Sequence, residues 1–103
     1  YGERRRLEIA RALASSPRML LLDEPVAGMR QRGIRQVGDL VRSLAEEGMT
    51  VLLIEHNMAF VMDLCLRITV LSFGRTITTG TPAEVGAHPE VIEAYLGGQE
   101  DHA

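Results

Sequence analysis

Residues 19–25 read MLLLDEP and residues 51–56 read VLLIEH, and these two stretches decide the fold. Each begins with four consecutive apolar residues and ends in charged or polar ones. Such a run is too short for a helix, and prolines at positions 17 and 25 bound the first, so both runs are predicted to be buried strands of a parallel sheet. The polar residues that follow the strands would then lie at one edge of that sheet.

Helical patterns flank and separate these strands. Residues 3–14 are rich in good helix formers, and apolar side chains recur at three- and four-residue steps over residues 33–47, where Gly48 is expected to end the helix. A short helix is expected over residues 58–65. Alternation of helix and strand with apolar strands buried on both faces is typical of a three-layer α/β fold.

The end of the chain predicts a hairpin followed by helices. The β-branched residues 68–71 and a partner strand at residues 75–79 flank a Phe-Gly turn. Residues 81–84 (TPAE) have the form of a capping box with proline at the first helical position, and a final helix is expected over residues 89–96, stopped by the glycines at 97–98. The predicted fold class is α/β, a mostly parallel sheet with helices on both faces and a C-terminal antiparallel hairpin.

The composition describes an ordinary globular chain of 103 residues with 46% apolar and 24% charged side chains. Its apolar runs are far shorter than the about 20 residues that span a bilayer. The net charge of −3 argues against a nucleic-acid partner. The single cysteine, Cys65, cannot form an internal disulfide, which suits a reducing, cytoplasmic setting.

Candidate chemistry lies at the carboxyl ends of the two strands, where ligands gather in open parallel sheets. Asp23 and Glu24 follow the first strand and His56 follows the second. One carboxylate could hold Mg²⁺ while its neighbour acts as a base toward water, and the imidazole could contact a phosphate oxygen. The amino end of the first helix, at Gly2 and Glu3, could also meet a phosphate.

Each of these features has a plainer interpretation. Asp and Glu after an apolar strand are often loop residues or a helix cap, and a lone histidine carries less weight still. Arg4, Arg5 and Arg6 fit a solvated helix face. On this interpretation the chain is a non-catalytic α/β interaction or regulatory module.

Taken together, the motifs resemble the second half of the ATP-binding subunit of ABC transporters over almost the whole chain. Residues 1–3 are similar to the end of the signature motif, with its typical helix following at residues 5–13. Residues 19–24 look like Walker B with its catalytic glutamate, residues 27–29 like the D-loop, and residues 54–58 like the switch-histidine loop.

The resemblance implies ATP and Mg²⁺ as cofactors and ATP hydrolysis coupled to transport. By it, Asp23 supports Mg²⁺, Glu24 polarises the attacking water and His56 contacts the γ-phosphate. Gly2 would touch the nucleotide held by the opposite subunit, and the same motifs place Glu3, Ala27 and Gly28 among the nucleotide-binding residues. The implied partners are transmembrane permease subunits and a second ATP-binding subunit, identical or related, on the inner face of the cell membrane.

The ending resembles the C-terminal extension of branched-chain amino acid importers, over residues 80–85 and 91–97. This divides the chain into residues 1–80, the C-terminal half of the ATPase core, and residues 81–103, a helical extension. One departure from the family follows the D-loop, where Arg30, Gln31 and Arg32 replace the usual Asn or Asp and then Pro.

The larger departure is the absence of lysine, because all eleven basic residues are arginine. A phosphate-cradling loop of the form GxxxxGK[ST] requires a lysine. The isolated chain is therefore expected to be a fragment that does not hydrolyse ATP. Without the strand of that loop, it is also expected to self-associate through exposed strand edges or to close the gap by rearranging its hairpin.

Overall fold

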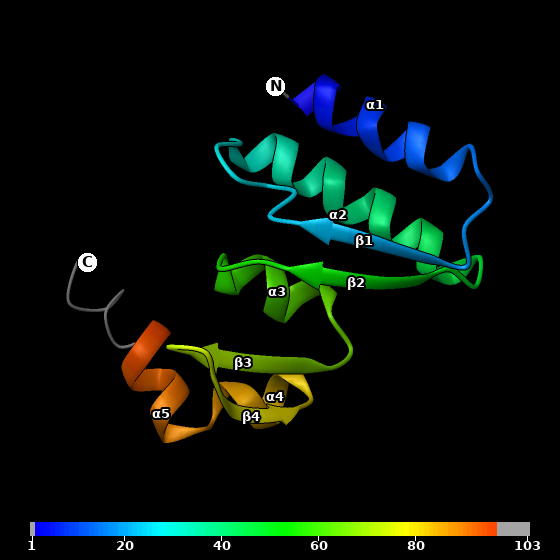
Figure 1. Cartoon of the computed structure of the whole chain (residues 1–103). Helices are drawn as coiled ribbons and strands as arrows, with labels where there is room; N and C mark the ends of the chain where they lie inside the picture. Colours follow the sequence, from blue (N-terminus) through cyan, green and yellow to red (C-terminus); the bar gives the residue numbers. More distant parts are fainter. Residues whose placement is uncertain (1, 97–103) are drawn as a thin grey trace. The chain divides into compact units, whose positions relative to one another are not determined.

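The computed structural model describes residues 2–96, so the predicted helix stop at Gly97 and Gly98 lies outside the described residues (Figure 1). The chain divides into two compact units, residues 1–56 and residues 57–103. The predicted division at residue 80 follows family segments rather than compactness and stays a prediction. Within the described range, no helix is long and apolar enough to cross a membrane.

The first unit alternates helix and strand as predicted. It contains helix α1 (Gly2–Leu13), strand β1 (Met19–Asp23), helix α2 (Gln31–Glu46) and strand β2 (Thr50–Ile54). The two strands pair in parallel, with Leu21 opposite Leu52. Helix α2 begins two residues earlier than expected, so Gln31 and Arg32 form part of its first turn. The α/β fold class is confirmed, with a small parallel sheet and a separate antiparallel pair of strands.

Helix α2 packs through one apolar stripe and stops where the sequence predicts. Val37, Val41 and Leu44 are buried at steps of four and three residues, which places them on one face of the helix. Gly48 follows with a φ of 97°, a left-handed conformation that glycine adopts without steric cost. Its N–H donates to the Ala45 carbonyl at 3.0 Å, satisfying one of the last carbonyls of the helix.

Among residues 2–96, the parallel sheet is covered on one face only, which corrects the expectation that both strands are buried on both faces. Leu20 and Leu22 of β1 are buried, whereas Met19 and Leu21, on the opposite face, are exposed. On β2 the exposed face continues through Leu52 and Ile54. Side chains alternate across a strand, so an unbroken apolar run does not reveal which faces other elements cover.

The second unit consists of a hairpin and short helices. Its elements are helix α3 (Met58–Leu64), strands β3 (Ile68–Ser72) and β4 (Arg75–Gly80), helices α4 (Pro82–Gly86) and α5 (Pro89–Val91), and a π-helical turn at Ile92–Leu96. The strands pair antiparallel, with a register shift between Val70 and Leu71. Val85 and Val91 are completely buried and anchor the last helices. Tyr95 donates its hydroxyl to the Leu71 carbonyl at 2.5 Å, which ties the final turn to the hairpin.

The capping box predicted at residues 81–84 is present at the start of α4. The Thr81 hydroxyl accepts the Glu84 N–H at 3.3 Å, and the Glu84 carboxylate accepts the Thr81 N–H at 2.9 Å. The backbone hydrogen bond from Thr81 is the main reason that the pKa of Glu84 lies below its ordinary value of 4.5. This hydrogen bonding favours the charged carboxylate.

Removing the capping box is expected to destabilise the second unit. Thr81→Ala should lower the free energy of unfolding by about 1 kcal/mol, because one helix N–H loses its acceptor.

Since folding lowers the pKa of Glu84, the contribution of this carboxylate to stability is complete above pH 4.5 and is lost as the pH falls through the lowered value. Urea unfolding of wild type and Glu84→Ala should therefore differ at pH 7 and converge in acid. An equal difference at both pH values would contradict this role of the carboxylate.

Candidate active site

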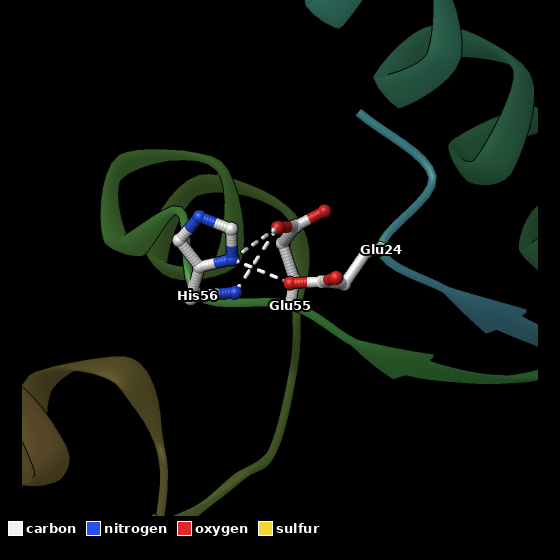
Figure 2. A group of neighbouring side chains, drawn as sticks. All are labelled: Glu24, Glu55 and His56. Carbon is white, nitrogen blue, oxygen red and sulfur yellow. Dashed lines mark hydrogen bonds and ion pairs between the residues drawn. The ribbon is translucent and has the colours of Figure 1, made fainter. Parts of the chain in front are cut away.

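Three side chains meet at the ends of β1 and β2: Glu24, Glu55 and His56 (Figure 2). The His56 Nδ1 atom lies 2.7 Å from a Glu24 carboxylate oxygen and 3.5 Å from a Glu55 carboxylate oxygen. Glu24 follows β1 directly, and Glu55 and His56 follow β2. Residues separated by about thirty positions in the sequence thus form one cluster at one edge of the sheet.

Parallel pairing creates this juxtaposition. Asp23 is in register with Ile54, and the Glu24 N–H donates to the Ile54 carbonyl at 2.7 Å, extending the pairing one residue past β1. In Figure 1 the carboxyl ends of both strands point to the same end of the first unit, and the amino ends of α1 and α2 lie toward it as well. Strand ends and helix amino ends converge there, as expected for a ligand site in an open parallel sheet.

The backbone at Glu24 is held in an unusual conformation. Its φ is 47°, in the left-handed region that non-glycine residues seldom occupy. Two hydrogen bonds and a buried neighbour hold this backbone conformation. The Glu24 N–H donates to the Ile54 carbonyl, the Ala27 N–H donates to the Glu24 carbonyl at 3.2 Å, and Pro25 is completely buried. A strained residue held by several contacts is characteristic of functional sites.

The cluster combines one buried carboxylate with two accessible groups. The Glu24 and His56 side chains are 49% and 72% exposed, whereas that of Glu55 is only 1% exposed. Glu24 and His56 can therefore meet a ligand or water from solution. A carboxylate beside an imidazole can transfer a proton to or from a bound molecule and can place a positive charge there when the ring is protonated.

Asp23 is the candidate residue that the structure keeps apart from the three-residue cluster. It is the last residue of β1 and is exposed. It lines a recess that α1 contributes to through Arg5, Glu8 and Ile9. Its predicted role as the Mg²⁺ ligand stays a prediction.

The other predicted nucleotide-binding residues lie in neighbouring segments. Gly2 and Glu3 begin α1. Ala27 and Gly28 lie in the loop between β1 and α2, where Gly28 has a φ of 74° that allows a tight turn. Their contact with a nucleotide also stays a prediction.

Sequence reasoning did not select Glu55. Glu55 ends the second apolar run and lies within residues 54–58, which resemble the switch-histidine loop, but no role was predicted for its side chain. The signal that would have pointed to it is its position at the strand end directly before His56, where the side chain turns toward the β1 loop. Its hydrogen bond from the Val26 N–H depends on that neighbouring loop, and the sequence alone does not reveal this contact.

Two family models match the chain. The model described as ABC transporter matches residues 1–27, and the model described as branched-chain amino acid ATP-binding cassette transporter matches residues 75–101. The first match includes the stretches that resemble the signature motif and Walker B, and the second overlaps the C-terminal extension.

Curated relatives match over nearly the whole chain. The lipopolysaccharide export system ATP-binding protein LptB of Acidithiobacillus ferridurans is 45% identical over 95% of this chain and 41% of its own length. The high-affinity branched-chain amino acid transport ATP-binding protein LivG of Escherichia coli K12 is 43% identical over 94% of this chain and 38% of its own length. The chain therefore spans about two fifths of the length of these relatives.

Solved structures agree with the sequence matches. The ADP conformation of MJ1267, an ATP-binding cassette of an ABC transporter, superposes with a TM-score of 0.83 at 32% identity, over 93% of this chain and 39% of that one. The cbiO1 protein of Clostridium perfringens, part of the ABC transporter complex cbiONQ, gives a TM-score of 0.79 at 35% identity, over 90% of this chain and 38% of its own. By sequence and by fold, the chain is similar to about two fifths of an ATP-binding protein of the ABC transporter family.

Proposed function

We propose that this chain carries the hydrolytic residues of an ABC transporter ATP-binding subunit. The observation that supports this most directly is the 2.7 Å contact between the accessible Glu24 and His56 side chains. In this role the Glu24 carboxylate orients the attacking water and accepts its proton. In the protonated ring, His56 donates Nδ1–H to Glu24 and offers Nε2–H to an oxygen of the γ-phosphate.

The donor set suits the cofactors of such a subunit. Asp23 presents an exposed carboxylate at the strand end, the hard oxygen ligand that Mg²⁺ prefers. When bound, Mg²⁺ would neutralise charge on the phosphates. Gly2 and Glu3 at the amino end of α1 would meet a nucleotide held by the opposite subunit, while Ala27 and Gly28 would lie near the nucleotide in the adjacent loop.

Branched-chain amino acids are the proposed solute of the complete transporter. The family-model match over residues 75–101 favours them, and so does the similarity to LivG. Lipopolysaccharide export is the second candidate, because LptB is as similar to this chain as LivG is. In either system the partners would be transmembrane permease subunits and a second ATP-binding subunit, on the inner face of the cell membrane.

The chain alone is proposed to self-associate through its parallel sheet. β1 and β2 form a two-stranded sheet, so within the described residues each strand has one outer edge without a strand partner. Unpaired strand edges beside exposed apolar side chains favour pairing between chains. Met19, Leu21, Leu52 and Ile54 supply such side chains on one face of this sheet.

Measuring phosphate release from ATP tests separately whether the 103-residue chain and the full subunit hydrolyse ATP. The 103-residue chain with ATP and Mg²⁺ is expected to release no more phosphate than a protein-free blank, because it contains no lysine to hold the β- and γ-phosphates. The full subunit should hydrolyse ATP and, with its permease, drive uptake of labelled leucine into vesicles.

Three outcomes would count against these assignments. Release by the isolated chain that Glu24→Gln abolishes would contradict its predicted inactivity. A full subunit without ATPase activity would favour the non-catalytic interaction or regulatory module. Lipopolysaccharide export without leucine uptake would select the second solute.

A further inference from the structure

Glu55 is a buried carboxylate that the proposed reaction does not use. It lies in the same cluster as Glu24 and His56, yet its side chain is 1% exposed, so it cannot meet a ligand from solution as they can. Burying a carboxylate is costly unless hydrogen bonds compensate the lost hydration. The identity of its hydrogen-bond partners therefore indicates what the carboxylate does.

The two oxygens of Glu55 bridge the loops that carry the two accessible residues. One oxygen accepts the Val26 N–H at 3.4 Å, two residues after Glu24. The other accepts the His56 N–H at 3.0 Å and lies 3.5 Å from the His56 ring nitrogen Nδ1. A single rigid group thus connects the β1 loop to the β2 loop at the point where Glu24 and His56 meet.

The β1 loop needs such a connection because Glu24 has a left-handed backbone. Residues in this conformation persist only where surrounding contacts hold them. The bond to Val26 acts on the carboxyl side of Glu24, and the bond between the Glu24 N–H and the Ile54 carbonyl acts on its amino side. Together they fix the direction in which the Glu24 side chain leaves the sheet.

We propose that Glu55 is a positioning residue that holds the Glu24 and His56 loops at the separation required for hydrolysis. The inference rests on the proposed function, because Glu24 and His56 are the residues assigned to it. Filling the buried space does not require a charge: an apolar side chain of similar size would avoid the desolvation cost. It would, however, leave the Val26 and His56 N–H groups without this acceptor.

Hydrogen exchange measured by NMR tests the bridge in the 103-residue chain itself. In Glu55→Leu, the Val26 amide should exchange about tenfold to a hundredfold faster relative to the β1–β2 ladder amides, because it loses a bond to a charged acceptor. The His56 amide resonance should shift, and the nuclear Overhauser contact between Glu24 and the His56 ring should weaken.

Glu55→Gln is the conservative variant, and Asp39→Asn is the matched control. Gln keeps one oxygen acceptor, so protection of the Val26 amide should be partly restored. Asp39 pairs with Arg42 on the exposed surface of α2, so its substitution should leave all three signals unchanged. If Glu55→Leu folds and both the Val26 protection and the Glu24–His56 contact match wild type, the proposal is overturned. It is also overturned if Glu55→Gln, which keeps only one of the two oxygen acceptors, changes neither the Val26 protection nor the His56 amide resonance.

Kinetics of the full subunit test the consequence for the reaction. Glu55→Leu is expected to lower kcat at least tenfold with a much smaller change in KM for ATP, and Glu55→Gln should recover part of the loss. An unchanged kcat would overturn the positioning role. A wild-type subunit without ATPase activity would instead refute the proposed function, and the exchange data would still decide whether Glu55 sets the Glu24–His56 geometry.

Discussion

Glu24→Gln is expected to lower kcat for ATP hydrolysis by the full subunit about 100- to 10,000-fold, the range that removal of a general base produces. Gln has nearly the size and shape of Glu, so the loop and its left-handed residue should keep their conformation. It cannot accept a proton from water. KM for ATP should change little, because Glu24 is assigned to the attacking water rather than to nucleotide binding. Steady-state phosphate release gives both constants.

A matched glutamate on the same unit serves as the control. Glu46 is exposed near the end of α2, and Glu46→Gln should leave kcat unchanged. His56→Ala should also lower kcat, since the side chain 2.7 Å from Glu24 would be gone. A Glu24→Gln subunit with wild-type turnover would show that another group accepts the proton.

Leu20→Asp is expected to unfold the first unit. Leu20 is 4% exposed, on the covered face of β1. Placing a carboxylate there without a partner costs about 4 kcal/mol or more, against a total of about 5–15 kcal/mol for a typical domain. Urea unfolding followed by circular dichroism should show the transition of this unit lost or moved to much lower denaturant.

Leu21→Asp is the matched comparison, one residue further along the same strand. Leu21 is 59% exposed on the opposite face, so stability should change by no more than about 0.5 kcal/mol. Because the new charge lies on the apolar face beside the strand edges, light scattering should report weaker self-association than for wild type. Equal destabilisation by both substitutions would mean that the sheet is covered on both faces in solution.

The positions of the helices and strands were predictable because they depend on local physics. The four-residue apolar runs became β1 and β2, and Gly48 ended α2. Thr81 and Glu84 formed the capping box at the start of α4. In each case, residues within a few positions of one another fix the backbone. The final segment, residues 89–96, is helical as expected but divides into α5 and a π-helical turn.

The site was predictable only in part. Because parallel strands end at the same edge, the sequence indicated that Glu24 and His56 could share a crevice, and the structure brings them into contact. Asp23 was expected with them but faces the recess beside α1. Glu55 was missed, since its significance depends on the Val26 N–H from the other loop.

The linear sequence was enough to predict the order of the elements, the strand ends that carry the polar residues, and the resemblance to ABC transporter ATP-binding subunits. These follow from periodicity, turn residues and motifs that a linear chain displays. Long-range packing, in contrast, covers Leu20 while leaving Leu21 exposed, and it lets the buried Glu55 connect the Glu24 loop to His56. Both depend on which segments distant in the chain pack together, and an apolar run or a single carboxylate is compatible with several such packings.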